Sequence, residues 1–133
     1  NEYVTDESFK YIQQLSQLND LRMMDIRGIS EEYFANMPTV RTLGASSCRI
    51  TDAGLKRFLD TAIEIRQLDI SDTNVTFECI SIARDWTERT GKQLELFVSY
   101  EMIQQYRHSD MQKNDYKLTI NHGALQDSDL FDW

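Results

Sequence analysis

Residues 40–55 read VRTLGASSCRITDAGL and combine a short strand with the start of a helix. Apolar residues alternate over 43–45, which is typical of a strand with one buried face. Thr51 followed by Asp52 is typical of a helix start, because the hydroxyl can accept a hydrogen bond from a first-turn amide and the carboxylate complements the helix dipole. Leu55 then begins an apolar helix face. The stretch predicts a strand–turn–helix unit.

The same unit recurs along the chain. Helix starts that open with a β-branched residue and then Ser or Thr recur at residues 4–9, 29–34, 50–55 and 75–80. A unit of this kind can bury its apolar residues only against neighbouring copies. We therefore expect an α/β fold in which short parallel strands lie side by side. The central apolar residues of these strands, aligned by pattern, are Met24, Leu43, Leu68, Leu94 and Leu118.

Residues 40–55, with Cys48 and Ile50 at their positions in the pattern, resemble the cysteine-containing leucine-rich repeat. This subtype is found in F-box leucine-rich-repeat proteins, which are subunits of ubiquitin ligases. The resemblance covers residues 4–96, with a degenerate copy near Leu118. It implies a leucine-rich-repeat solenoid with short parallel strands on the concave face and helices on the convex face.

The C-terminal third departs from the repeat. We expect a longer helix from Phe77 to about Thr90, ended by Gly91, and a further helix over residues 99–106. The predicted organisation is a repeat domain over residues 1–125, made of about five irregular repeats of which the last is degenerate. An acidic-aromatic tail over 126–133 follows it.

The tail has two possible roles, which the sequence leaves open. Its large apolar residues could fold back to cover the open end of the solenoid, because solenoid ends need a cover. They could instead dock on a partner protein. The residues concerned are Leu130, Phe131 and Trp133.

The two cysteines are predicted to be structural. Cys48 is expected in the turn after its strand, as a small buried group, and Cys79 on an apolar helix face. Because they occupy different parts of the unit, we expect no disulfide between them. Two cysteines are also too few for an extracellular disulfide scaffold, which favours a cytoplasmic or nuclear location.

Charge and composition narrow the partner classes. The formal net charge is −8, which disfavours nucleic acids and anionic membranes and favours a basic or mixed-charge protein partner. The apolar runs are much shorter than the roughly 20 residues of a membrane span. Partner classes other than protein are therefore not expected.

The sequence contains no motif typical of an enzyme active site or a metal site. His108 and His122, with two scattered cysteines, give no zinc-ligand spacing. No glycine-rich phosphate loop and no nucleophile motif occurs. We therefore expect no enzyme activity, metal, cofactor or small-molecule substrate.

The candidate site is a surface made by the strands. Positions that flank the buried strand residues point to the opposite face of the sheet. Aligned by pattern across the repeats, one column of such positions would be an acidic stripe, in which we place Asp25, Gly44, Asp69 and Glu95. We hypothesise that a basic or mixed-charge segment lies along this stripe. The alternative is that the stripe is only a solvated face.

Neighbouring columns complete the candidate surface. Gln67 lies on one side of the stripe, and Arg27 and Phe97 lie on the other. A large apolar residue such as Phe97 is the kind that dominates binding energy at interfaces. With the tail included, the predicted protein-binding residues are Asp25, Arg27, Gln67, Asp69, Glu95, Phe97, Leu130, Phe131 and Trp133.

The predicted function is that of a protein–protein interaction module. The resemblance implies substrate or adaptor recognition in a ubiquitin-ligase complex. Two alternatives stay open, because one fold can serve several roles. The chain could be a structural scaffold or assembly factor of a stable complex, or it could be a protein inhibitor.

Overall fold

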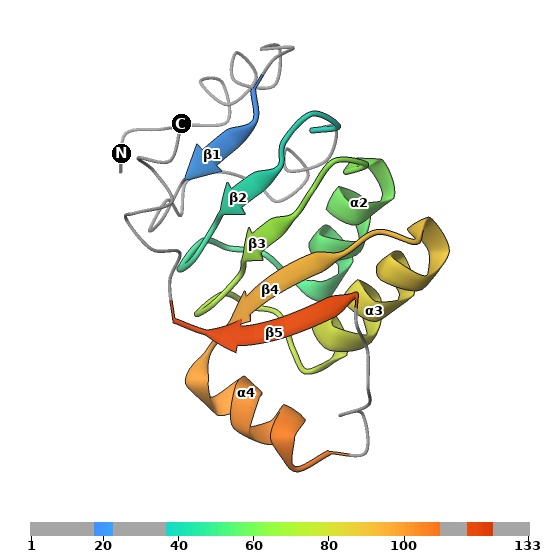
Figure 1. Ribbon diagram of the computed structural model, residues 1–133. Coiled ribbons are helices and arrows are strands. Elements are labelled where there is room, and N and C mark those ends of the chain that lie inside the picture. The colour runs from blue at the N-terminus through green and yellow to red at the C-terminus, as the bar shows by residue number, and fades with distance from the viewer. Residues whose placement is uncertain (1–17, 23–36, 110–116, 124–133) are drawn as a thin grey trace.

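A computed structural model describes residues 18–22, 37–109 and 117–123 (Figure 1). Its centre is a sheet of five strands that lie in the same order as in the chain, and every neighbouring pair is parallel. The α/β class and the parallel pairing agree with the prediction. The strands are β1 (Asp20–Arg22), β2 (Thr42–Gly44), β3 (Gln67–Asp69), β4 (Leu94–Val98) and β5 (Leu118–His122).

Three helices are described, and each follows a strand. Helices α2 (Asp52–Thr61) and α3 (Glu78–Thr90) lie side by side on one face of the sheet (Figure 1). Helix α4 (Tyr100–Arg107) follows β4 and contacts β5 at the edge of the sheet. The last two helices match the helices predicted from the sequence to within one residue at each end.

The core lies between the sheet and the two side-by-side helices. Alternate strand residues point into it, including Leu43, Leu68 and Leu96, each at most 1% exposed. Helix α2 contributes Leu55, Phe58 and Leu59, while α3 contributes Ile80, Ala83 and Trp86, all buried. Burial of this apolar area on folding is the main stabilising contribution.

The strand register differs from the predicted register at two places. Leu68 pairs with Leu96 instead of Leu94, which shifts β4 by two residues. Leu43 pairs with Leu21 instead of Met24, which shifts β1 by three. Sequence pattern fails at these points because each segment offers two apolar residues that could fill the same position. Backbone hydrogen bonds select one of them.

The turns that follow β2 and β3 stack directly on each other. The amide of Ala45 donates to the carbonyl of Asp69 at 2.9 Å, and the amide of Ser47 donates to that of Ser71 at 3.0 Å. Further along, the amide of Asn74 donates back to the carbonyl of Ile50 at 2.9 Å. These bonds pair backbone groups of one turn with those of the next.

Each stacked turn contains one residue in the left-handed conformation, Ser47 with φ 60° and Asp72 with φ 57°. The two positions correspond in the strand register, in which Leu43 pairs with Leu68. Cys48 and Thr73 follow them, and Cys48 is buried in its turn as predicted. The left-handed residue is therefore a shared property of the two turns.

The helix starts form largely as the sequence predicts. Thr51 caps α2, with its Oγ1 accepting from the amide of Gly54 at 3.3 Å. In α3, Thr76 Oγ1 accepts from the amide of Glu78 at 3.2 Å, and Gly91 ends the helix with φ 72°. Asp52 links the two starts, because its carboxylate accepts from both the amide and the hydroxyl of Thr76.

Several predictions fall on residues outside the described ranges. They include the helix starts at 4–9 and 29–34 and the tail over 126–133. Within the described ranges, none of the helices has the length and apolar character needed to cross a membrane.

Candidate functional site

Side chains on the sheet face that is turned away from α2 and α3 form a continuous polar row, which we call the ladder. Thr42 Oγ1 donates to Gln67 Oε1 at 3.3 Å, and Gln67 Nε2 donates to Glu95 Oε1 at 3.0 Å. From the other side, Asn121 Nδ2 donates to Glu95 Oε2 at 2.6 Å. The ladder spans β2 to β5, and two of its three donors, Gln67 and Asn121, converge on the Glu95 carboxylate.

Strand alternation explains why these side chains meet. Thr42, Gln67 and Glu95 are directly paired across β2, β3 and β4. Each lies next to a buried leucine in its strand and so points to the opposite face. Glu95 is paired with Thr119 of β5, and Asn121, two residues further along β5 on the same face, reaches Glu95 diagonally.

A hollow of about 420 Å³ lies beside the ladder, over the amino-terminal ends of β3, β4 and β5. Gln67 and Glu95 line it together with two cationic residues, Arg66 and Lys117. The hollow is therefore lined by one carboxylate and two cationic side chains. Such a hollow could receive a segment that carries both a cationic and an anionic group.

The predicted acidic stripe is wrong for the described residues. Asp69 is 0% exposed, so it is not a surface charge. Its cross-strand neighbours are Gly44 and Phe97, while Glu95 lies in the column of Gln67. The cause is the two-residue shift of β4, which moves Glu95 out of the column that contains Asp69.

Asp69 has a structural part in its turn. Its Oδ1 accepts from the amide of Ser71 at 3.0 Å and from the Ser71 hydroxyl at 2.7 Å. This local pattern is one that aspartate commonly makes in turns. Among the described side chains, the Asp69 Oδ2 atom is the one buried oxygen or nitrogen without a hydrogen-bond partner.

The other predicted site residues have different outcomes. Gln67 and Glu95 lie together in the ladder, as part of the predicted surface. Phe97 lies on the ladder face but is only 9% exposed, so it is a nearly buried residue instead of an exposed anchor. The remaining candidates, Asp25, Arg27, Leu130, Phe131 and Trp133, lie outside the described residues.

Sequence reasoning missed part of the surface. The sequence pattern singles out only residues 118–120 of the last strand, in which Leu118 and Ile120 alternate with a polar residue, but β5 extends to His122 and so includes Asn121. Arg66 and Lys117 stand immediately before β3 and β5. The parallel register, which brings such positions to one edge, was the signal that could have found them.

The buried thiol of Cys79 offers no nucleophile. Burial and, to a lesser extent, the nearby Asp52 carboxylate raise the pKa of Cys79 to about 12. Its Sγ lies 3.3 Å from Met102 Sδ in α4. A thiol that stays protonated is a packing group, because the thiolate is the reactive form.

Within residues 18–22, 37–109 and 117–123, no three His, Cys, Asp or Glu side chains converge as metal ligands. Comparison with known proteins gives no match, either to a family model or to a curated sequence. The ladder and its hollow are therefore the features from which a function is argued.

Proposed function

We propose that the chain is a cysteine-containing leucine-rich-repeat solenoid that binds another protein through the ladder. Two features of the fold support the repeat assignment. Strands pair in chain order, and ladder hydrogen bonds join residues 25 and 28 positions apart. Cys48 and Thr73 occupy corresponding turn positions, as expected for consecutive copies of one repeat.

The observation that carries the binding proposal is the convergence of the ladder on Glu95. Its carboxylate is held by side chains from two neighbouring strands, so it loses little freedom when a partner arrives. Groups that are already in place reduce the entropic cost of association. A polar row on strands also matches how parallel sheets present alternate side chains to a ligand.

The charges around the hollow favour a mixed-charge segment over a purely basic one. Glu95 attracts a Lys or Arg of the partner, and Arg66 attracts an Asp or Glu placed a few residues away. Charge pairs of this kind set specificity and register more than raw affinity. The partner class that fits is therefore an extended protein segment with charges of both signs.

Among the roles open to such a module, we favour substrate or adaptor recognition in a ubiquitin-ligase complex, in keeping with the repeat subtype. A scaffold or assembly factor would hold a stoichiometric partner without changing that partner's turnover. An inhibitor would block the partner's active site. Measuring the partner's half-life and activity, with and without this chain, separates the three roles.

The first experiment identifies the partner by position-specific crosslinking. A photo-reactive amino acid replaces Gln93, an exposed residue that lines the hollow. The matched control places the same group at Ser81, an exposed residue of α3 on the opposite layer. We expect a native-extract protein that is captured from position 93 and not from position 81.

The second experiment tests the ladder with the purified partner. Glu95→Gln removes the charge on which the donors converge, and we expect at least a tenfold loss of affinity at low salt. Glu88→Gln, on an exposed position of α3, makes the same charge change away from the ladder and should leave affinity unchanged. Equal affinity of the two variants and the unmodified chain would refute binding through the ladder.

A further inference from the structure

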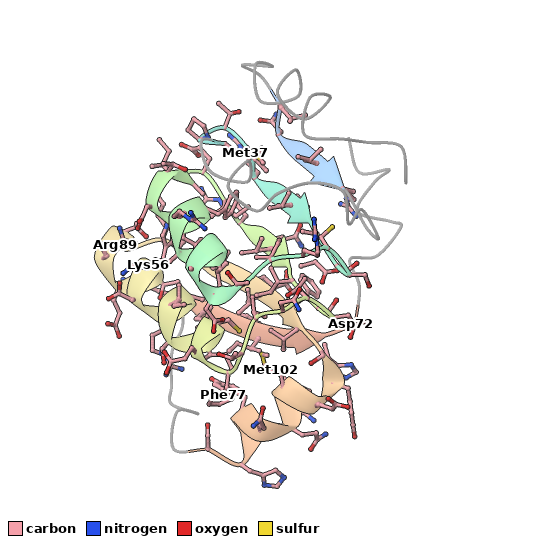
Figure 2. All side chains as sticks on the ribbon, turned by 180° about the vertical axis from the view of Figure 1, so that it is seen from behind. Met37, Lys56, Asp72, Phe77, Arg89 and Met102 are labelled. Atoms are coloured by element: carbon pink, nitrogen blue, oxygen red, sulfur yellow. The ribbon has the colours of Figure 1, made fainter. Side chains whose placement is uncertain are left out.

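A second cavity lies at the opposite ends of the strands from the hollow, between the turn 70–77 and the start of α4. Its volume is about 560 Å³. Four apolar residues line it, namely Ile70, Val75, Phe77 and Met102, and Phe77 and Met102 lie close together in Figure 2. We call this cavity the turn groove.

The turn groove exists because the stacking of turns stops at β4. The turn after β2 is hydrogen-bonded to one side of the turn after β3, as the bonds from Ser47 to Ser71 and from Asn74 to Ile50 record. On the other side, Ser99 alone separates β4 from α4. The space where a third turn would stack is therefore not filled by residues of the β4–α4 junction.

The shape of the groove follows from this origin. Two backbone hydrogen bonds, from Ser47 to Ser71 and from Asn74 to Ile50, join the turn after β2 to the turn after β3. The lining comes from two separate segments, residues 70–77 and 99–105, so an extended segment that lies between them could contact both. Such a segment could place one apolar side chain between Phe77 and Met102, in the way that a leucine or methionine fills a gap in a core.

The charges that line the turn groove indicate which charge a bound segment should carry. Asp72, on the turn, and Glu101, in the first turn of α4, line the groove and are both exposed. None of the described residues that line it carries a positive charge. A cation beside the apolar side chain would be attracted from two sides, whereas an acidic segment would be repelled.

We propose that the turn groove is a second protein-binding site, which takes an extended partner segment with one apolar residue next to Lys or Arg. The acidic tail of this chain, with Asp127, Asp129 and Asp132, has the wrong charge to occupy it. The site is separate from the ladder, so its test is independent of the ladder's role in binding.

The probes are ten-residue peptides, each with one Leu or Phe flanked by Lys or Arg, and matched peptides with Glu in place of the basic residues. Binding is followed by the methyl resonance of Met102, assigned through a Met102→Leu variant. We expect saturable shifts with the basic peptides at concentrations up to about 1 mM, and none with the acidic ones.

Paired variants localise the binding. Asp72→Asn with Glu101→Gln should weaken the basic peptides at least tenfold, while Asn keeps the left-handed backbone at position 72 accessible. Asp85→Asn with Glu88→Gln makes the same charge change on exposed positions of α3 and should have little effect. Glu95→Gln should leave peptide binding unchanged, which separates this site from the ladder.

Three outcomes would overturn the proposal. The Met102 resonance could fail to shift with any basic peptide, or the acidic peptides could shift it equally. The two double variants could also lose affinity to the same extent, which would indicate general charge attraction. Circular dichroism of each variant confirms that the fold is kept.

Discussion

The chain leaves the sheet in different ways at two of its strand–helix junctions, the one after β3 and the one after β4. After β3 the chain makes a wide turn over residues 70–77 before α3 begins, and this turn stacks on the one that follows β2. After β4, Ser99 alone precedes α4. Strand pairing nevertheless continues across the boundary, since Leu68 of β3 still pairs with Leu96 of β4. We call the paired strands the sheet layer and the stacked turns the turn layer. Strand pairing and turn stacking can therefore end at different places in the molecule.

The layers also differ in what holds them. The sheet layer rests on buried leucines together with backbone hydrogen bonds. The turn layer rests on polar links, such as the carboxylate of Asp52 on Thr76. Near the start of α4, the buried thiol of Cys79 in α3 donates to Met102 Sδ at 3.3 Å. Substitutions in the two layers should therefore have effects of different size.

The largest effect is expected in the sheet layer. Leu68→Ala and Leu96→Ala each remove a side chain that is at most 1% exposed, and each should lower the free energy of unfolding by about 2–5 kcal/mol. The two losses should be similar, although Leu96 lies beyond the last stacked turn. Chemical denaturation measures both. A much smaller loss for Leu96→Ala would show that the sheet weakens where the turns stop.

An intermediate effect is expected in the turn layer. Asp52→Ala removes two hydrogen bonds to Thr76 and a first-turn charge of α2, and it should cost about 1–2 kcal/mol. Glu101→Ala is the matched change in the first turn of α4, at the junction without a wide turn. It should stay within about 0.5 kcal/mol. Equal costs would contradict a special role for the turn link.

A smaller effect, dependent on pH, is expected where the Cys79 thiol of α3 contacts Met102 of α4. The pKa of Cys79 is raised from 9.0 to about 12 in the folded chain, so the unfolded chain releases this proton first as pH rises. Stability is therefore unaffected by this group below pH 9 and falls between pH 9 and about 12, by about 1 kcal/mol from pH 8 to pH 10.

The control for this pH effect is Cys79→Ala, which removes the titrating group while the rest of the chain titrates as before. Denaturation curves at pH 8 and pH 10 should show a smaller decline for Cys79→Ala than for the unmodified chain. Equal declines would mean that the thiol does not contribute.

The smallest effect is expected at the left-handed turn positions. Ser47→Gly should raise the free energy of unfolding by up to about 1 kcal/mol, because serine at φ 60° is strained and glycine is not. Asp72→Gly should gain less, since aspartate tolerates this conformation better than serine. Thermal unfolding compares the two. A loss of stability in Ser47→Gly would contradict strain at this turn.

Much of the fold could be predicted from local patterns. The Thr51–Asp52 helix start, the stop at Gly91 and the alternation around Leu43 and Leu68 each reflect a physical requirement of one short segment. The same patterns gave the α/β class and the parallel order of strands. They also put Gln67 and Glu95 on the correct face of the sheet.

Register and burial could not be predicted in the same way. A shift of two residues keeps every side chain of β4 on its face, so alternation could not decide between Leu94 and Leu96. The burial of Asp69 could not be predicted either, because an aspartate in a strand pattern suggests a surface charge. Hydrogen-bond partners on different strands, such as Asn121 and Glu95, can be identified only when the strand register is known.

The parallel ladder has a consequence for how the chain folds. Its hydrogen bonds join residues 25, 28 and 26 positions apart. To form each strand pair, the chain must therefore close the loop of residues between the two strands. The entropy lost in closing a loop changes slowly with loop length, which makes these closures nearly equal in cost. Contacts this distant along the chain slow folding relative to helical bundles of the same size. The sheet should therefore nucleate at one strand pair and grow outward, one strand at a time.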